Sequence, residues 1–480
     1  MTEDNDLNSS SAPATTQPPS GAKVTTFLSS PAVKFVLIGV LTFLLLIPSV
    51  FVWILVEERS DRASEVARDI ARSWGGTQQI NGPYLVIPFT ETFTTGLGDK
   101  LKTETVQRTA VLFPERLTVE GDITVEERKK SIYALPVYKG RMNLGGAFAS
   151  PPENMFEPKH GGTIDVAADK AVLVVGISDV RALKSEIALA LDGSRPVPFE
   201  PGLGPLAMSA GRHVYGAIAP SGINTSVTPA TWRKGFSFDI PLQLNGSTAI
   251  YFAPAGQTTK VALKSDWPHP GFTGAFLPET RSISDSGFEA DWTIPYLARG
   301  IPKVLETNQV PLQNKLLGVK FVEPVNFYQT ISRSLKYAIG FISLTFLAVF
   351  VLEMRSGWRF HWIQYALVGL ALIIFYVMLL AFAEHVGYGT AYLIAGAAAT
   401  LLNAFYIGTS LKSRVAGLVM LVVLGSIFAI LFALMREQDY ALLIGSVIAF
   451  IALAITMFVT QRIDWTGEQG TRDRLSTEPV

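Results

Sequence analysis

The chain has 480 residues, of which 49% are hydrophobic and only 17% are charged, and this composition excludes an ordinary soluble protein. Lysine plus arginine equals aspartate plus glutamate at 40 each, so no net field favours nucleic acid or acidic partners. The absence of cysteine excludes disulfides, thiol nucleophiles and thiolate metal sites.

The N-terminal part combines a polar tail with one long apolar run. Residues 1–30 are rich in Ser, Thr, Pro and Ala and have too few large apolar side chains to offset the entropy lost on ordering, which predicts a disordered cytoplasmic tail. Residues 35–56 are uncharged and exceed the roughly 20 residues needed to cross a ~30 Å hydrocarbon core. Glu57, Glu58 and Arg59 follow in place of a signal-peptide cleavage site, so we expect a first transmembrane helix that stays in place.

A helix is expected to continue beyond this span. Apolar residues recur every four positions up to Trp74, which is typical of an amphipathic helix over residues 57–76. Gly75 and Gly76 provide its stop. Within the span itself, Pro48 is expected to kink or loosen the helix locally. The segment after the span is therefore predicted to be a periplasmic juxtamembrane helix.

Residues 77–330 have the composition of a β-rich domain, with β-branched and aromatic residues between frequent Gly and Pro. The clearest strand is 236–244, where apolar residues alternate strictly with other types, so that one face is buried. Pro241 suggests a sheet edge, and Asn245-Gly246 offers a hairpin turn into the next strand. Other strand-like runs lie at 84–89, 109–113, 117–125, 131–138, 171–177, 186–191, 248–252, 260–267 and 319–327. So many short strands predict a large all-β, sandwich-like domain, with a distorted barrel as the alternative.

Further apolar runs follow this domain. The five uncharged runs are 337–352, 363–383, 391–411, 415–434 and 440–460. The loops between them are short, so consecutive helices are expected to be antiparallel neighbours. The sequence therefore predicts an α-helical polytopic membrane protein with six transmembrane helices, a β domain inserted between helices 1 and 2, and a cytoplasmic tail at 461–480.

The charges in the short loops favour one orientation. Basic residues gather between spans two and three, between four and five, and after span six, at Arg355, Arg359, Lys412, Arg414, Arg462, Arg472 and Arg474. The opposite loops carry only Arg436, which lies beside Glu437 and Asp439. Because basic loops stay in the cytoplasm, both termini are expected inside and the large domain outside.

Five segments resemble the CreD family of bacterial inner-membrane proteins, which are described as cell-envelope integrity proteins. They are SWGGTQQINGPYLVIPF at 73–89, ISDVRALK at 177–184, the block beginning SDWPHPGF at 265–299, VKFVEPVNFYQTISRSLKYA at 319–338 and the block beginning QYALVGLA at 364–395. The resemblance covers nearly all of the chain after residue 30. It implies a Gram-negative inner membrane, a β domain in the periplasm, a role in envelope stress and a link to the Cre two-component system. It supplies no catalytic residue.

No pattern indicates an enzyme, a cofactor or a metal site. The histidines are His160, His213, His269, His361 and His385, and no two of them have the helical spacing of metal ligands. The sequence has no Walker loop and no nucleophile elbow. Asp179 and Arg181 flank a turn, where a stabilising ion pair is favoured over catalysis. We therefore expect a non-enzymatic protein without catalytic, cofactor-binding or metal-binding residues.

The six apolar runs contain no Asp, Glu, Lys, Arg or His, which argues against an ion or proton path through them. Asn403 is the main polar residue, and a hydrogen bond between helices is favoured over a role in a substrate path. Glu384 and His385 lie at the outer end of the third span. A solvated membrane boundary is favoured there over a pH-sensitive pair.

The first candidate interaction loop lies in the β domain and comprises Trp267, Pro268, His269, Pro270 and Phe272. Proline on both sides of the histidine fixes the backbone and places aromatic side chains close together. A rigid packed loop is the favoured explanation, and a contact with a ligand or a protein is the alternative.

The second candidate loop lies on the cytoplasmic side and comprises Arg355, Trp358, Arg359 and Trp362, with His361 among them. Aromatic and basic side chains together are typical of membrane interfaces. Anchoring to lipid headgroups is favoured, and contact with another protein is the alternative.

The leading function is a non-enzymatic inner-membrane protein for cell envelope integrity and stress response. One alternative is a sensor that binds a periplasmic ligand and signals through the first transmembrane helix, and another is a lipid or small-molecule transporter. The expected partners are membrane lipids and other inner-membrane or periplasmic envelope proteins, with no nucleic acid.

Overall fold

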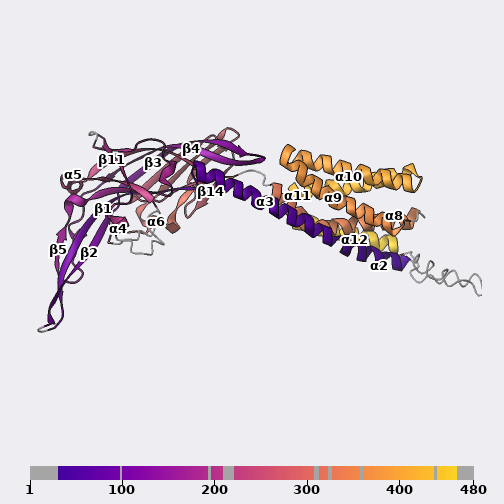
Figure 1. Cartoon of the computed structure of the whole chain (residues 1–480), viewed down its shortest axis with the longest axis horizontal. Helices are drawn as coiled ribbons and strands as arrows, with labels where there is room; N and C mark the ends of the chain where they lie inside the picture. The colour runs from indigo at the N-terminus through magenta and orange to yellow at the C-terminus, as the bar shows by residue number, and fades with distance from the viewer. Residues whose placement is uncertain are drawn as a thin grey trace, which may run out of the picture. The chain divides into compact units, whose positions relative to one another are not determined.

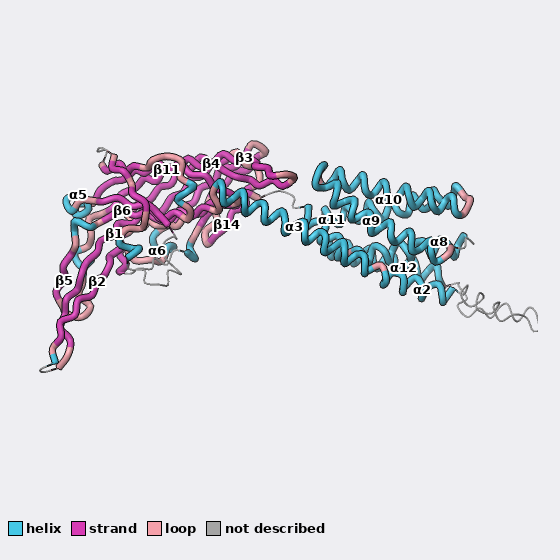
Figure 2. The backbone as a smooth tube through the Cα atoms, in the orientation of Figure 1, coloured by secondary structure: helices cyan, strands magenta, loops and turns pink. Residues whose placement is uncertain are grey.

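The structure is a computed structural model, which describes residues 31–97, 100–192, 196–208, 221–306, 313–322, 327–356, 360–436 and 441–461 (Figure 1). The chain divides into two compact units: Met1–Ser60 together with Asn326–Val480, and Asp61–Val325. The first unit is helical and the second consists mainly of strands (Figure 2). The predicted combination of apolar helices with a large β-rich region is therefore confirmed.

The helical unit contains most of the apolar residues. Its helices are α2 (Pro31–Leu44), α3 (Leu46–Trp74, up to Ser60), α7 (Phe327–Lys336), α8 (Ala338–Ser356), α9 (Trp362–Val386), α10 (Tyr388–Ser410), α11 (Arg414–Arg436) and α12 (Ala441–Thr460).

Not all of these helices are long enough to cross a membrane. Four described helices are long and apolar enough, namely Val33–Trp74, Trp362–Val386, Tyr388–Ser410 and Arg414–Met435. The helices α7 and α8 meet at a bend of 52° and give a fifth span if the pair is counted as one. The apolar part of α12, Leu443–Phe458, is shorter. Six transmembrane helices therefore stay a prediction.

The first long helix is interrupted at one residue, Leu45, which separates α2 from α3. Proline has no N–H, so Pro48 cannot donate to the carbonyl of Leu44. The neighbouring helical bonds remain: Leu45 N donates to Leu41 O at 3.0 Å and Ser49 N donates to Leu45 O at 3.3 Å. The predicted local loosening around Pro48 is confirmed, and the chain continues as helix to Trp74.

The core of the helical unit is built on close contacts of α10 with α9 and α11. Small residues of α10, among them Ala391 and Ala395, are fully buried, which allows the close approach. Asn403 does not form the expected bond between helices: its Nδ2 donates to Ala399 O of the same helix at 2.8 Å. A short amide side chain reaches the carbonyl four residues back, which explains the difference.

The β unit is built from two sheets. The first has the order β14-β18-β12-β1-β6-β10-β9, with β2 and β5 also paired to β1 and β17 paired to β2. Its strands are β1 (Gln78–Thr95), β2 (Lys102–Leu112), β5 (Thr163–Val166), β6 (Val172–Ile177), β9 (Glu200–Pro201), β10 (Ser221–Ser226), β12 (Ala249–Phe252), β14 (Pro270–Gly274), β17 (Val304–Glu306) and β18 (Leu317–Phe321).

The second sheet has the order β15-β16-β13-β3-β4-β11-β7-β8. Its strands are β3 (Arg116–Lys130), β4 (Tyr133–Phe148), β7 (Ala188–Leu191), β8 (Val197–Pro198), β11 (Phe236–Ser247), β13 (Thr258–Ser265), β15 (Thr280–Ser284) and β16 (Gly287–Ile294). The short helices α4 (Pro205–Met208), α5 (Pro229–Lys234) and α6 (Tyr296–Arg299) lie between strands in the chain.

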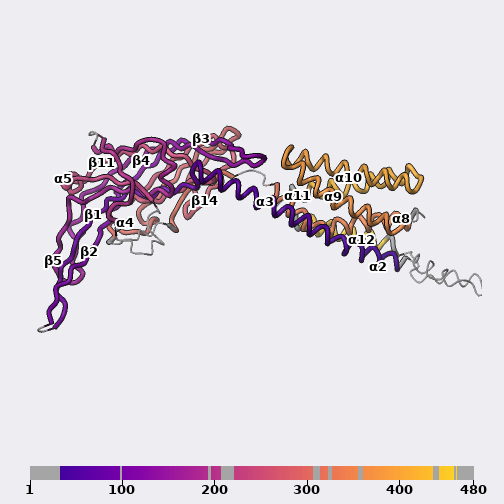
Figure 3. Tube along the Cα trace, in the orientation of Figure 1, coloured from indigo at the N-terminus to yellow at the C-terminus, as the bar shows by residue number. Residues whose placement is uncertain are grey.

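The two sheets share one hydrophobic core. The predicted alternation of β11 is confirmed, because Phe236, Phe238, Ile240, Leu242 and Leu244 are all at most 4% exposed. Figure 3 shows the far parts of β1 and β2 running together with β5 away from the rest of the first sheet, and we call this extension the arm.

Two details of the β11 region differ from the sequence prediction. The pair Asn245-Gly246 makes no hairpin: β11 continues through it and pairs Gly246 with Tyr138 of β4. The chain then passes to the first sheet at Thr248, whose φ is 67°. A Cβ at Gly246 would lie 2.3 Å from the Tyr138 ring, so glycine is required here by packing and not by a turn. Pro241 does not mark an edge strand either, since β11 lies between β4 and β7. Proline is tolerated at this position because it lies beyond the two residue pairs of the β7 ladder.

Candidate functional site

The Trp267 loop is fastened to β18. Trp267 Nε1 donates to Val322 O at 3.2 Å, and Val322 N donates to His269 O at 3.3 Å. Pro270 begins β14 and pairs with Phe321. The loop is thus held at both ends by the neighbouring strand, which agrees with the rigid packed loop favoured from the sequence. Its role in binding a partner stays a prediction.

The remaining side chains of this loop divide between core and solvent. Phe272 packs edge-on against Phe288 and Trp292, with ring centroids 5.7 and 5.8 Å away. His269 is exposed, and Pro268 is partly exposed. A partner of this loop would therefore contact His269 and Pro268, while Phe272 packs against the hydrophobic core.

The second predicted loop is only partly covered. Trp358, Arg359 and the side chain of Arg355 lie outside the described residues. Trp362 begins α9 and is 52% exposed. His361 caps this helix: its Nδ1 accepts from Ile363 N at 3.4 Å. The predicted anchoring by this loop stays a prediction.

Directly beside this loop lies a buried carboxylate that the sequence prediction missed. Glu353 of α8 is 2% exposed, and its oxygens accept from Lys34 Nζ at 2.5 Å, from Phe360 N at 2.9 Å and from Tyr365 Oη at 2.9 Å. The expectation of a bundle free of charged side chains is therefore wrong. Glu353 lies one residue beyond the apolar run 337–352, whereas α8 continues to Ser356.

A second carboxylate, Glu384, lies near the end of α9. It accepts from Tyr328 Oη of α7 at 3.1 Å and lies 3.9 Å from Arg59 Nη1 of α3. Its side chain is only 8% exposed, so the solvated boundary expected for Glu384 is wrong. His385 is exposed, because adjacent residues on a helix point in different directions.

Both carboxylates pair with the first long helix, Glu353 with Lys34 and Glu384 with Arg59. Lys34 and Arg59 are separated by about 37 Å along a helix at ~1.5 Å per residue. This distance slightly exceeds a hydrocarbon core of ~30 Å. The two ion pairs therefore have the spacing expected for the two boundaries of a membrane.

In the β unit, the end of α3 is held by β3 and β4. The guanidinium of Arg128 lies over the Trp74 ring at 4.0 Å from its centroid. Trp74 Nε1 donates to Tyr138 O at 3.3 Å. Lys130 Nζ lies 3.3 Å from a carboxylate oxygen of Asp69, one turn earlier on the helix. These contacts fix the helix end to the hairpin of β3 and β4, and we call them the helix clasp.

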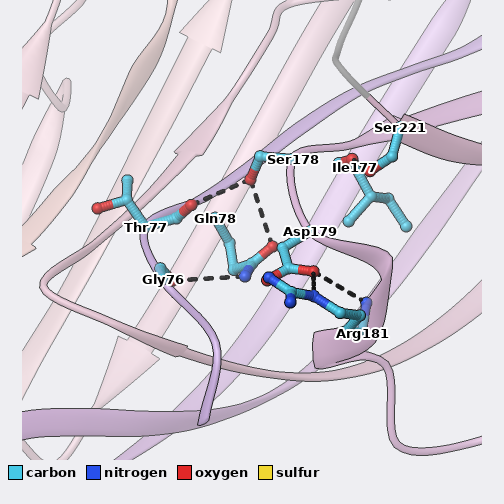
Figure 4. Close-up of polar contacts among 8 residues, drawn as sticks. All are labelled: Gly76, Thr77, Gln78, Ile177, Ser178, Asp179, Arg181 and Ser221. Carbon is cyan, nitrogen blue, oxygen red and sulfur yellow. Dashed lines mark hydrogen bonds and ion pairs between the residues drawn. The ribbon is translucent and has the colours of Figure 1, made fainter. Parts of the chain in front are cut away.

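The chain then enters β1 through a polar cluster (Figure 4). Ser178 Oγ donates to Thr77 O at 3.0 Å and lies 3.4 Å from Gln78 Oε1. Gln78 is fully buried, and its Nε2 donates to Gly76 O at 3.4 Å. The bonds join the start of β1 to the end of β6, so the helix clasp is followed at once by an anchored strand.

Asp179 and Arg181 form the ion pair expected from the sequence. Arg181 donates with Nε and Nη2 to the two carboxylate oxygens of Asp179, both at 2.9 Å (Figure 4). The hydrogen bonds from the Arg181 side chain hold the pKa of the Asp179 carboxyl below its usual range. The backbone N–H of Arg181 donates to the same carboxylate, which closes the turn. This is the stabilising role that the sequence favoured.

The arm carries a buried carboxylate of its own. Glu91 of β1 is fully buried, and it accepts from Arg108 Nη1 at 2.5 Å and from the backbone N–H of His160 at 2.6 Å. The ring of His160 stacks on Phe93 with centroids 4.2 Å apart. Burial alone would raise the pKa of Glu91, but the hydrogen bonds from His160 and Arg108 outweigh it and lower the pKa. No sequence signal links the two strands and the loop that carry Glu91, Arg108 and His160.

Several segments that resemble the CreD family contribute to the first sheet, and residues 265–299 also contain β15 and β16 of the second sheet. Residues 73–89 supply the start of β1, 177–184 follow β6, 265–299 contain β14, and 319–338 contain most of β18. These strands are neighbours or next neighbours in the sheet. The first sheet and the helix clasp beside it are therefore the best candidate site in this unit.

Among the described residues, no group of three or more His, Asp or Glu side chains could hold a metal ion. The polar clusters above are instead ion pairs and hydrogen bonds that join distant segments.

Comparison with known proteins agrees with the resemblance. The family model described as inner membrane protein CreD matches residues 30–466. The inner membrane protein CreD of Escherichia coli (strain K12) is 34% identical over 428 residues, which cover 88% of this chain and 91% of that relative. The match thus includes both the helical unit and the β unit.

Proposed function

The chain belongs to the CreD family of inner membrane proteins, and from that premise we propose that it is a non-enzymatic protein that maintains cell envelope integrity under stress. We place six helices in the inner membrane, both termini in the cytoplasm and the β unit in the periplasm. The apolar helices and the charges of the short loops support this topology. The family resemblance supports the envelope role and the link to the Cre two-component system.

One observation carries the proposal: a single helix joins the membrane unit to the β unit and is fixed in both. Arg59 pairs with Glu384 in the helical unit, and Trp74 is held by Arg128 and Tyr138 in the β unit. In this proposal, α3 tethers the β unit to the membrane. A tethered domain suits contact with the bilayer or with neighbouring envelope proteins.

The topology can be tested with introduced cysteines, because the natural chain has none. Ser286→Cys lies at the exposed turn between β15 and β16, and Ser10→Cys lies in the N-terminal tail. In cells with a permeabilised outer membrane, an impermeant maleimide should label Ser286→Cys at once and Ser10→Cys only after lysis. The opposite labelling order would overturn the proposed orientation.

The function can be tested in a strain that lacks the chromosomal copy. We expect increased sensitivity to detergents and to envelope-damaging antibiotics, which the full chain restores and the Trp74→Ala variant restores only in part. Gly76→Ala is the matched control, since a Cβ at Gly76 would meet open space. Unchanged sensitivity of the deletion strain under every envelope stress would contradict the proposed role in envelope integrity.

A second candidate function is a sensor that signals through α3, and the helix clasp favours it. A ligand bound to the β unit could shift the clasp and thereby the helix. The test is saturable binding of fractionated periplasmic extract to the full chain, together with changed hydrogen exchange at residues 69–74. Binding without any change at these residues would contradict a signal through α3.

A further inference from the structure

A cavity of about 400 Å³ lies between α2 and the start of α9. Its walls include Leu37 and Leu41 of α2 and Trp362 and Tyr365 of α9, and Lys34 lies at one end of the α2 wall. Residues 34, 37 and 41 share one helical face, so the wall runs from a cationic end to an apolar end.

The cationic end keeps hydrogen-bonding capacity. Among the described residues, Lys34 Nζ has one recorded acceptor, Glu353 Oε1, although an ammonium group has three donors. Glu353 already accepts from three donors and is almost fully buried. Lys34 itself is 20% exposed, and among the described residues that line the cavity it is the one Lys or Arg, so its ammonium is available to an entering ligand.

The rest of the cavity does not suit water. Apart from Lys34 and His361, the wall is mainly apolar, with Leu37, Ile38, Leu41 and the ring of Trp362, and such a wall favours contact with a hydrocarbon chain. Trp362 is half-exposed at this end of the helical unit, which is typical of a residue at the level of lipid headgroups. The cavity therefore matches a molecule with one anionic end and one apolar chain.

We propose that this cavity binds one anionic phospholipid, with the phosphate at Lys34 and one acyl chain along Leu37 and Leu41. The charge of the ammonium and the apolar wall each match one part of that molecule. Inorganic phosphate would leave the apolar wall empty. This site goes beyond the proposed envelope function and does not depend on it.

The experiment is native mass spectrometry of the full chain released from bilayers that contain equal amounts of phosphatidylglycerol and phosphatidylcholine with identical acyl chains. The natural sequence should retain one phosphatidylglycerol in excess over phosphatidylcholine. Leu41→Trp fills the cavity and should lose this preference. Val40→Trp is the matched control, since Val40 is 60% exposed and is not part of the cavity wall, and it should keep the preference.

A second variant tests the charge without changing the shape. The pair Lys34→Gln with Glu353→Gln can retain a hydrogen bond, so that it leaves no buried carboxylate unpaired. It should retain the same total lipid and lose the preference for phosphatidylglycerol. Equal retention of both lipids by the natural sequence, or an unchanged preference in a folded Leu41→Trp or double variant, would overturn the site. Displacement of the lipid by inorganic phosphate would likewise contradict an acyl chain in the cavity.

Discussion

The guanidinium of Arg128 lies 4.0 Å from the centre of the Trp74 ring, so the last residue of α3 is covered by a charge from the β3–β4 hairpin. The Nε1–H of Trp74 donates to Tyr138 O, so the β3–β4 hairpin supplies both contacts of this side chain. Such a contact stabilises the end of a helix that would otherwise fray. The β3–β4 hairpin therefore stabilises the helix end that Gly75 and Gly76 mark in the sequence.

Arg128→Ala should loosen this end of the helix. A cation over an exposed aromatic ring contributes about 0.5–1 kcal/mol, so amides 71–74 should exchange about two- to fivefold faster. Hydrogen exchange with mass spectrometry on the full chain measures this directly. Lys264→Ala removes another surface ion pair, with Glu289, and should leave these amides unchanged. Unaltered exchange in Arg128→Ala would show that the hydrogen bond to Tyr138 suffices.

Lys34→Met should destabilise the helical unit, because Glu353 would remain buried without its counter-charge. Breaking a buried pair costs about 3–5 kcal/mol, and the lower end applies because Lys34 is itself 20% exposed. Denaturation of the detergent-solubilised chain by sodium dodecyl sulfate gives the difference. Adding Glu353→Gln should recover much of the loss, whereas Lys336→Met at an exposed position should have little effect. Failure of the second mutation to recover stability would argue against an electrostatic cause.

Glu91 should make the β unit sensitive to acid. Its pKa in the folded chain lies below the ordinary value of 4.5, because hydrogen bonds from His160 and Arg108 outweigh burial. A depressed folded pKa stabilises the fold above the unfolded pKa, and this contribution is lost as the pH falls through the folded pKa. Denaturant unfolding of the full chain should therefore show stability falling below about pH 4.5, and Glu91→Gln should flatten that dependence. Glu120→Gln, at an exposed position of β3, serves as the control.

Gly246→Ala should disrupt the crossing between the two sheets. Its Cβ would lie 2.3 Å from the ring of Tyr138, which is buried and donates its hydroxyl to Ala249 O. Overpacking of this kind costs about 1–3 kcal/mol. The measurement is the unfolding midpoint of the β unit in the full chain, and Gly76→Ala is the control with open space around the added methyl group. A second change, Tyr138→Leu, should partly restore Gly246→Ala if the ring is the cause.

Local patterns were sufficient for much of the fold. The alternation in 236–244 predicted which face of β11 is buried, since strand side chains alternate whatever the partner strand is. Apolar length alone indicated the long helices, and Gly75-Gly76 marked the end of α3. These features depend on neighbours in sequence, so the sequence shows them directly.

Contacts between distant segments could not be predicted in the same way. Lys34 and Glu353 are 319 positions apart, and each lies just outside an apolar run, so no local pattern indicates that they pair. The Asn245-Gly246 pair is a common turn signal, but here glycine is required because it packs against the ring of Tyr138, more than a hundred positions earlier in the chain. Glu91, Arg108 and His160 likewise meet only through the pairing of the arm.

The position of β18 has a consequence for biogenesis. Among the described strands it is the last in the chain, yet it lies between β14 and β12, and β12 in turn pairs with β1, the first of them. β14 lies at the end of the sheet, and its neighbour there is β18. While the polypeptide is being made, β14 therefore cannot join the sheet until Leu317–Phe321 has been made. The first sheet is therefore completed only when synthesis has reached the residues just before α7. The β unit can finish folding only at about the time when the apolar helices that begin with α7 are being made.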